Sequence, residues 1–563
     1  MRKYHSLNFL TIKKTMKIMP PFLTTLAFFP LSAQAAPVPE LPGAANAGVQ
    51  LERARESMEQ ERIAQQIGED EARRGEKVQG QAEDKPQAAA SDLVFVLKKV
   101  ETDQSVILSQ EELDSIIKPY INQSITIKDL YKIVDNINNT YIQKEYMTCR
   151  AFLPPQTIHD GVVQIKLVEG RTGTVRVEGN KSTLTRYITE RFPLQEGQIA
   201  NTGKLNRSLQ RFNGTNDMAL RIKMQAGEKP DTTDYVLYAF EPKDHNVTLY
   251  MDNNGYESSG RFRYGLFYNW RSVSGIRDSL RLSYLRSKGS GAYNLGYSIP
   301  VGRQGMKLDM DYTGNQNDVR RGDLRPLGIE GKASAYSIGL RYPLVVNSSK
   351  RYELGLLYLN QKSETTLGNG QVTWLDDKLH RYNLYTAFTH YGKNEVFYHR
   401  YGLMRSAKTS MDGKSEDVTL YQLNMYWRKG LPNDTAFITR FSSQLGGKSY
   451  MSTANRFYIG GMNTVRGYEE SFLGGDRGFA LGTEYHFPLM KKYLQGLVFF
   501  DYGRVSGGYV ISGADTLMST GLGIAWEQND FHANLILGKP LKKDVGGKKV
   551  DSLRVQFSLS KTF

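Results

Sequence analysis

An arginine set among glycines is the residue of this chain whose type and surroundings most clearly require a partner. Arg466 lies in Val465-Arg466-Gly467-Tyr468, called here the VRGY segment, between two stretches that alternate like β-strands. Downstream, in the run LVFFDYGRV, the same alternation places Asp501 opposite a face of three large side chains. If that face meets lipid, Asp501 points into a polar interior, where a charge persists only when it is paired or hydrated. We therefore expect an Arg466–Asp501 ion pair that sets the register of a loop and still permits rearrangement.

The elements that would position this pair are β-strands. From His245 onward helical periodicity disappears, and apolar residues alternate with polar ones. Roughly eleven such segments precede the VRGY segment and roughly five follow it, which predicts a barrel of about 16 antiparallel strands. A closed barrel over residues 245–563 would also satisfy every backbone group in lipid. A soluble sandwich or propeller is disfavoured, because strands with one apolar face would leave large apolar patches in water.

The composition fits a membrane barrel and disfavours other classes. Aromatic residues make up 11% of the chain, yet no run approaches the ~18 apolar residues that a membrane-spanning helix needs. The net charge of +15 is scattered, with no basic helix or arm, so we expect no nucleic-acid partner. Cys149 is the only cysteine, which excludes an internal disulfide, and its strand-like surroundings indicate a small buried packing residue.

The N-terminal part predicts export and several separate segments. Residues 1–35 have the positive, apolar and small-residue regions of a secretory signal peptide. Residues 44–74 predict a helix rich in both charge signs, which is either solvated or enclosed in a polar cavity. Residues 75–90 have the composition of a disordered linker, and the alternative is that both segments form one solvated spacer. Residues 92–170 and 171–243 each predict a β-α-α-β-β unit whose strand edges can accept an extended peptide.

Motifs of common enzymes and metal sites are missing from the sequence. Asp309, Asp311 and Gly314 imitate a calcium loop, but Arg320 stands where a bidentate glutamate is needed. The sequence has neither a helical HExxH motif nor a G-x-S-x-G turn. We therefore expect no enzymatic activity, no metal ion and no cofactor.

The chain resembles the outer-membrane transporters of two-partner secretion, the haemolysin and filamentous-haemagglutinin secretion/activation family. The resemblance covers nearly the whole mature chain. It rests on FLPPQTIHDGVVQIKLVEG and VRVEGN, which are similar to the end of one POTRA domain and the start of the next. In the barrel it rests on GGMNTVRGY, on the F-x-D-x-G pattern that ends at Gly503, and on the terminal Phe563.

The resemblance implies a β-barrel membrane protein with two POTRA domains and an N-terminal plug helix in front of it. The plug helix corresponds to residues 44–74, and the POTRA domains correspond to residues 92–170 and 171–243. In the family the helix closes the pore, and the POTRA domains bind the exported partner. A long loop, here residues 456–477, folds back into the lumen.

The resemblance also assigns roles to single residues. The arginine of the family's VRGY motif contacts an acidic residue of the barrel wall, which implies a contact of Arg466 with Asp501. Glu484, on the inward face of GFALGTEYHF, is the expected second acidic partner. Phe563 corresponds to the C-terminal signal of outer-membrane barrels, which implies contact with the barrel assembly machinery during biogenesis.

These features imply an outer-membrane pore, with its POTRA domains in the periplasm, that exports one large haemolysin- or adhesin-type partner without ATP. The partner's class stays open between a cytolysin, an adhesin, a contact-dependent toxin and a haem-acquisition protein, as does the question of its activation. One alternative is a barrel assembly factor, which usually carries more POTRA units and lacks a plug helix. The other is a diffusion porin, which would leave both α+β units without a purpose.

Overall fold

The structure is a computed structural model that describes most of the chain. The expected signal peptide (1–35) and most of the expected linker (75–90) lie outside the described residues. Within these residues, no helix combines the length and apolar character needed to cross a membrane. The described residues are 43–72, 79–80, 94–411, 413–447, 450–490, 493–508, 510, 515–546 and 548–563.

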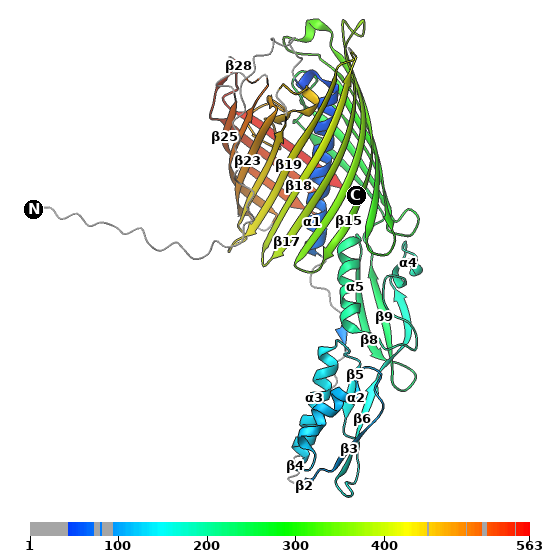
Figure 1. Ribbon diagram of the computed structural model, residues 1–563. Coiled ribbons are helices and arrows are strands. Elements are labelled where there is room, and N and C mark those ends of the chain that lie inside the picture. The colour runs from blue at the N-terminus through cyan, green and yellow to red at the C-terminus, as the bar shows by residue number, and fades with distance from the viewer. Residues whose placement is uncertain are drawn as a thin grey trace, which may run out of the picture. The chain divides into compact units, whose positions relative to one another are not determined.

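Sixteen antiparallel strands close into a barrel (Figure 1). Eleven of them precede the VRGY segment and five follow it, which confirms the expected number. The strands are β10 (His245–Asp252), β11 (Arg263–Arg271), β12 (Ser279–Arg286), β13 (Ser290–Val301), β14 (Met306–Asp318), β15 (Glu330–Val346), β16 (Lys350–Leu367), β17 (Val372–Gly392), β18 (Glu395–Ser410), β19 (Ser415–Gly430), β20 (Ala436–Gly446), β23 (Arg477–Met490), β24 (Leu494–Ser506), β25 (Thr516–Gln528), β26 (Phe531–Pro540) and β29 (Arg554–Thr562).

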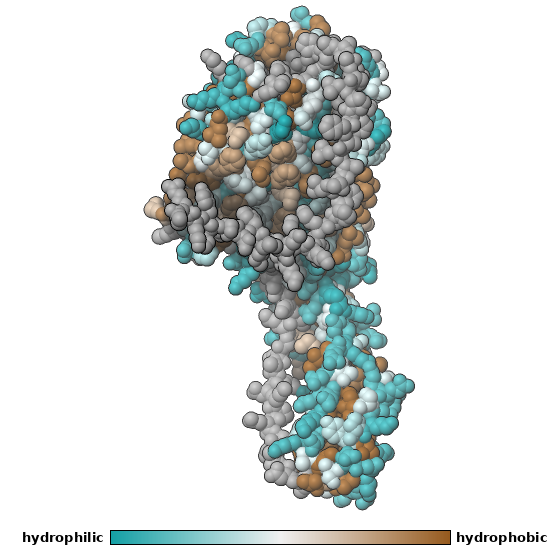
Figure 2. All heavy atoms as spheres, turned by 60° about the vertical axis from the view of Figure 1, so that its left-hand side comes forward, coloured by the Kyte–Doolittle hydropathy of each residue, from teal (hydrophilic) through white to brown (hydrophobic). Residues whose placement is uncertain are grey.

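The two faces of the barrel wall differ in polarity. Tyr264, Leu266 and Tyr284 are exposed on the outer face, whereas Thr313 and Asn315 are buried on the inner face. In Figure 2 hydrophobic residues gather on the barrel wall. This arrangement follows from the two-residue period of a strand, with one side turned to lipid and the other to a polar lumen.

The direction of the strands defines the two ends of the barrel. The first strand, β10, begins at His245, shortly after the strand β9 (Thr232–Phe240) of the second α+β domain. Since neighbouring strands run in opposite directions, the turns that follow β11, β13, β15, β17 and β19 lie at the end where β10 begins. We call this end the domain end.

The first α+β domain has the expected order, with its first strand divided in two. Its helix α2 begins with a capping box, in which Ser109 Oγ accepts from Glu112 N at 3.2 Å and the Glu112 carboxylate accepts from Ser109 N at 2.9 Å. Cys149 is buried in the core, and burial raises the pKa of its thiol to about 12, as expected for a packing residue. The elements are β2 (Val94–Val96), β3 (Lys99–Thr102), α2 (Gln110–Ile117), η2 (Lys118–Tyr120), β4 (Ser124–Thr126), α3 (Ile127–Gln143), β5 (Cys149–Phe152) and β6 (Val162–Glu169).

The second α+β domain contains a four-stranded sheet that includes part of the linker. Strand β1 (Gln79–Gly80) pairs in parallel with β8 at the edge of this sheet. The expectation of a disordered linker is therefore wrong at these two residues, because the unpaired backbone groups of an edge strand can order a neighbour of any composition. The other elements are β7 (Arg171–Glu178), α4 (Thr185–Thr189), α5 (Thr202–Thr215), β8 (Ala219–Ala226) and β9.

Helix α1 (Ala47–Ala72), preceded by η1 (Gly43–Ala45), lies inside the barrel and contacts β14, β15 and β16 (Figure 1). Ala47 and Leu51 are fully buried and pack against Ala333 of β15. Of the two alternatives for this segment, enclosure in a polar cavity is therefore the one that the structure supports. A solvated spacer is wrong for these residues.

The connection between β20 and β23 is folded against the inner face of the wall. It contains η4 (Thr453–Asn455) and a small pair of strands, β21 (Phe457–Ile459) and β22 (Leu473–Gly475), which do not join the barrel. Val465 is fully buried in a cluster with Val505 of β24. The VRGY segment thus lies in the lumen.

Candidate functional site

Arg466 is the centre of a buried ion-pair cluster. Its Nε and Nη2 donate to Asp501 Oδ2 and Oδ1, each at 2.7 Å, and its backbone N donates to Asp501 Oδ2 at 3.0 Å. Nη1 donates to Glu484 Oε1 at 2.7 Å. The guanidinium also lies over the ring of Phe499, 3.7 Å from its centroid. The structure therefore brings together the arginine and both carboxylates that the sequence singled out.

The burial of this cluster makes each charge depend on the others. The side chains of Arg466, Glu484 and Asp501 are 4%, 4% and 1% exposed. Removing one partner from such a group leaves an uncompensated buried charge, which costs about 3–5 kcal/mol. The bidentate contact with Asp501 also fixes the orientation of the Arg466 guanidinium plane.

The other residues of the VRGY segment place the arginine. Gly467 has φ of +87°, and a Cβ there would come within 3.2 Å of the backbone of Gly538 in β26. The hydroxyl of Tyr468 donates to the carbonyl oxygens of Met518 and Lys542 at 2.9 and 3.0 Å. The two residues after the arginine are therefore held against β25 and β26 of the wall.

Gly503 is needed for close packing beneath the same segment. A Cβ at this position would lie 2.8 Å from Cγ2 of Val465. Because Gly503 and Asp501 both face inward on β24, the F-x-D-x-G pattern combines an anion with room for the loop.

Sequence reasoning missed further members of the cluster. Arg440 of β20 donates to Glu484 Oε1 at 2.5 Å, and His486 Nε2 lies 2.7 Å from Glu484 Oε2. Alternation places Arg440 on the inner face. It does not reveal that β20 pairs directly with β23, because the intervening strands β21 and β22 do not join the barrel wall. The contact of Arg440 with Glu484 therefore had no signal in the sequence.

Helix α1 is tied to the inner wall by two ion pairs. Glu52 Oε1 lies 2.8 Å from Arg381 Nη1, and Glu59 Oε1 lies 3.0 Å from Arg400 Nη1. Both arginines are largely buried, with side chains 6% and 14% exposed. A helix with few apolar residues is thus held in the lumen mainly by charge and small-residue packing.

The helix also contacts the loop that carries the VRGY segment. Arg53 Nη2 donates to the carbonyl of Tyr458 at 3.0 Å, and Asn46 Nδ2 donates to Thr453 Oγ1 at 3.2 Å. On the wall, Arg381 joins the two occluding parts, since it pairs with Glu52 and also donates to the carbonyl of Ala454. Helix, loop and wall therefore form one connected polar network.

The loop also carries a carboxyl that titrates near neutral pH. Burial and the neighbouring Glu257 raise the pKa of Glu469 to about 7, although Arg554 acts in the opposite direction. A carboxyl with a raised pKa favours the docked loop while it is protonated, and this contribution is lost as pH rises from about 4.5 to about 7.

We therefore predict that the loop leaves its position more readily at pH 8 than at pH 5.5. Single-channel recordings should show more frequent openings at the higher pH. The Glu469→Gln variant should reduce the dependence of the opening frequency on pH but not abolish it, because burial raises the pKa of the adjacent Glu470 as well. If the opening frequency of the variant depended on pH as strongly as that of the unmodified protein, the role of Glu469 would be contradicted.

The remaining predicted residue lies at the barrel seam. Phe563 is exposed, and its backbone N donates to the carbonyl of Val247 in β10 at 2.9 Å. It therefore extends the pairing of the last strand with the first. Within the described part of the chain, no group of three or more His, Cys, Asp or Glu side chains is arranged for a metal ion.

Comparisons with known proteins point to one family. Residues 232–526, more than half of the chain, match the model of the haemolysin secretion/activation protein ShlB/FhaC/HecB, and residues 95–170 match the ShlB-type POTRA domain. A heme/hemopexin transporter protein HuxB of Haemophilus influenzae is 22% identical over 84% of this chain and 88% of its own length. An outer membrane transporter CdiB of Dickeya dadantii is 21% identical over 74% of this chain and 76% of its own length.

Solved structures show the same fold. CdiB from Escherichia coli aligns with a TM-score of 0.68 and 18% identity, over 94% of this chain and 100% of that chain. BamA from Haemophilus ducreyi lacking POTRA domains 1-3 aligns with a TM-score of 0.51 and 16% identity, over 83% of this chain and 100% of that chain. At these identities the likeness shows the fold alone.

Proposed function

Since this chain belongs to the ShlB/FhaC/HecB family of haemolysin secretion/activation proteins, we propose that it exports one large partner protein of the haemolysin or adhesin type. It is an outer-membrane transporter of two-partner secretion, with its POTRA domains in the periplasm. The observation that carries the proposal is a wide barrel whose lumen is occupied by a helix and a loop held through polar contacts. Such contacts close the pore at rest and can be exchanged when a chain enters.

We propose that the plug helix, the POTRA domains and the loop each have a separate role in export. Helix α1 plugs the pore, the POTRA domains bind the partner in the periplasm, and the Arg466 cluster holds the loop in its resting position. The partner threads through the lumen as an extended chain, and its folding outside the cell gives the movement its direction. This scheme requires neither ATP nor a catalytic residue.

Deletion of the gene tests the proposed function against its main alternative. Loss of one large protein from the culture medium, with the other outer-membrane proteins unchanged, would support export of a dedicated partner. Loss of many outer-membrane barrels would instead support a barrel assembly factor, the alternative that the likeness to BamA keeps under test. High, steady conductance that does not depend on α1 would support a diffusion porin.

The β8 edge of the second POTRA domain is the strand edge that we favour for partner binding. In the resting structure this edge is paired with β1, which belongs to the segment between the plug helix and the first POTRA domain. An extended segment of the partner that adds to β8 must displace β1. Binding of the partner would then release a segment that is continuous with α1.

We predict that fixing β1 to β8 blocks export. Gly80 and Met224 are paired neighbours, so the Gly80→Cys/Met224→Cys variant should form a disulfide in the oxidising periplasm. Secretion should fall at least about 10-fold and recover after addition of a reducing agent. Each single cysteine variant serves as control, and the native Cys149 is buried. Normal secretion by the fully oxidised double variant would exclude β8 as the binding edge.

A further inference from the structure

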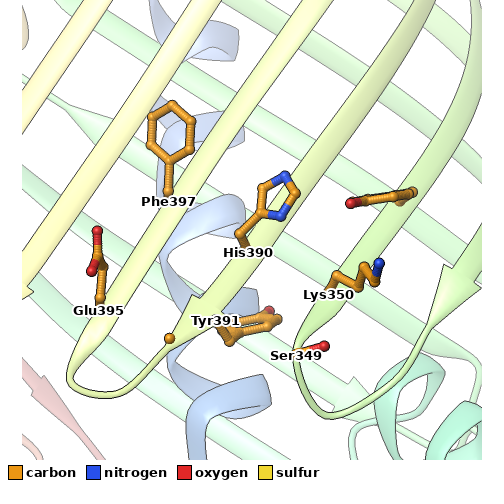
Figure 3. A pocket seen from close by; sticks show the side chains of 8 residues that line it. Ser349, Lys350, His390, Tyr391, Glu395 and Phe397 are labelled. Atoms are coloured by element: carbon orange, nitrogen blue, oxygen red, sulfur yellow. The ribbon is translucent and has the colours of Figure 1, made fainter. Parts of the chain in front are cut away.

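A shallow cavity of about 350 Å³ lies across β16, β17 and β18 (Figure 3). It is distinct from the lumen cluster and from the POTRA domains, and the proposed export mechanism does not use it. Its lining combines aromatic rings with charged and polar groups: Ser349, Lys350, Tyr352, His390, Glu395 and Phe397.

Strand register places the cavity on the outer face of the barrel. Lys350 is the paired neighbour of His390, which is also the paired neighbour of Phe397. The next residue, Tyr391, also borders the cavity (Figure 3), but it is buried and packs with Ile67 of α1 in the lumen. Because successive side chains of a strand face opposite ways, His390 and its two neighbours face outward. In Figure 3 α1 lies behind the strands that carry these side chains.

The cavity lies at the depth of lipid head groups. The turns after β15 and β17, at residues 347–349 and 393–394, are at the domain end of the barrel, which faces the periplasm. Rings from three strands form a continuous aromatic surface beside it. Tyr352 and Phe388 have centroids 5.0 Å apart, and His390 stacks on His399 at 5.6 Å. Amphipathic rings of this kind lie at the boundary between head groups and acyl chains.

The charges of the cavity favour an anion. Glu395 is already neutralised, since its carboxylate accepts from Trp427 Nε1 at 2.8 Å and from Lys429 Nζ at 2.5 Å. Within the described part of the chain, Lys350 forms no ion pair, and its ammonium lies 5.8 Å from the ring centroid of Tyr352. An ammonium and an imidazole therefore face the same opening, and the carboxylate that lines it, Glu395, is compensated by Lys429.

We propose that this cavity binds the phosphate of a glycerophospholipid from the periplasmic leaflet of the outer membrane. The ammonium of Lys350 and a ring N–H of His390 donate to phosphate oxygens, in a setting where charge-assisted hydrogen bonds are strong. The rings of Tyr352 and Phe397 contact the glycerol and the first methylene groups. An aromatic girdle alone would require only the rings, whereas the paired donors fit an anionic head group.

Lipid binding by the purified full chain tests the proposal independently of secretion. In native mass spectrometry, titration with dioleoylphosphatidylglycerol should give one lipid that stays bound when the detergent is removed. The Lys350→Gln/His390→Gln variant loses both proposed donors and should bind the lipid at least about 10-fold more weakly, which corresponds to the contribution of one charge-assisted hydrogen bond as a lower bound. Lys350→Arg should retain it. Dioleoylglycerol, which lacks the phosphate, should not bind at this site, and inorganic phosphate should not displace the lipid.

Lys561→Gln is the matched control. Lys561 lies at the same end of the barrel, and its Nζ is also 5.8 Å from a ring centroid, that of Phe563, but it donates to the carbonyl of Asn529 at 2.5 Å. This variant should bind the lipid as the unmodified protein does. Equal lipid retention in the Lys350/His390 double variant, equal retention of dioleoylglycerol, or displacement by inorganic phosphate would each overturn the proposal. Heat-dependent electrophoretic migration confirms that each variant contains a folded barrel.

Discussion

Replacing Arg466 with alanine is expected to reduce secretion of the partner at least about 100-fold while the barrel still inserts into the outer membrane. The substitution leaves Asp501 buried without the cation that it contacts at 2.7 Å, while Glu484 loses one of its two arginine partners and keeps Arg440. The docked position of the loop depends on this cluster, so its stabilisation should decrease by about 3–5 kcal/mol. The barrel itself is closed by sixteen paired strands and does not depend on the contact. Immunoblots of culture medium and outer-membrane fractions measure the two effects separately.

Three further variants separate the role of the cluster from a general loss of stability. Asp501→Ala should reproduce the defect, because it removes the carboxylate that binds both Nε and Nη2 of Arg466. Arg466→Lys keeps the charge but loses the planar guanidinium that donates two hydrogen bonds to Asp501, so secretion should fall less than in Arg466→Ala. Arg440→Ala is the comparison variant: Arg440 contacts the same Glu484, but its side chain is 49% exposed and links two neighbouring wall strands, β20 and β23, so secretion should fall much less than in Arg466→Ala. Unchanged secretion in both Arg466→Ala and Asp501→Ala would remove the proposed role.

The strand number was predictable from the sequence because alternation is a local property. Each strand turns one side to lipid and the other to the lumen. The residue type at each position therefore indicates which side it faces, as the exposed apolar side chains of Tyr264 and Leu266 do. Arg466 and Asp501 could be nominated in the same way, since a charge in either setting requires a partner. Neither inference needed to know which strands are neighbours.

The rest of the network could not be predicted because it depends on pairing between distant segments. Arg440 meets Glu484 only because β20 pairs with β23 and leaves β21 and β22 outside the barrel. Arg381 contacts Ala454 and Glu52, which are far from it and from each other in sequence. The composition of residues 44–74 predicts a polar helix, but many inward arginines could serve as its partners.

Reversing the charge of Glu52 and Glu59 together is expected to open the pore. In the Glu52→Arg/Glu59→Arg variant, each ion pair with Arg381 and Arg400 becomes a repulsion between like charges across about 3 Å. Even at an effective dielectric constant of about 20, such a pair costs on the order of 4 kcal/mol, and a change of about 3 kcal/mol alone shifts an equilibrium roughly a hundredfold. The buried packing of Leu51 opposes this shift but does not change with the charge.

Planar bilayer recordings should therefore show a persistently open, high-conductance state in this variant, and cells that carry it should take up large antibiotics. Glu56→Arg is the control, because it makes the same substitution at one position of the same helix, where the Glu56 carboxylate pairs with Arg53 of α1 rather than with the wall. This control should leave most channels closed. If the double variant stayed closed, packing and the hydrogen bond between Arg53 and the loop would be enough to hold the helix, and exchange of the ion pairs would not be what releases it. The charge-reversed helix therefore distinguishes a plug released by competition for its arginines from one that is pushed out.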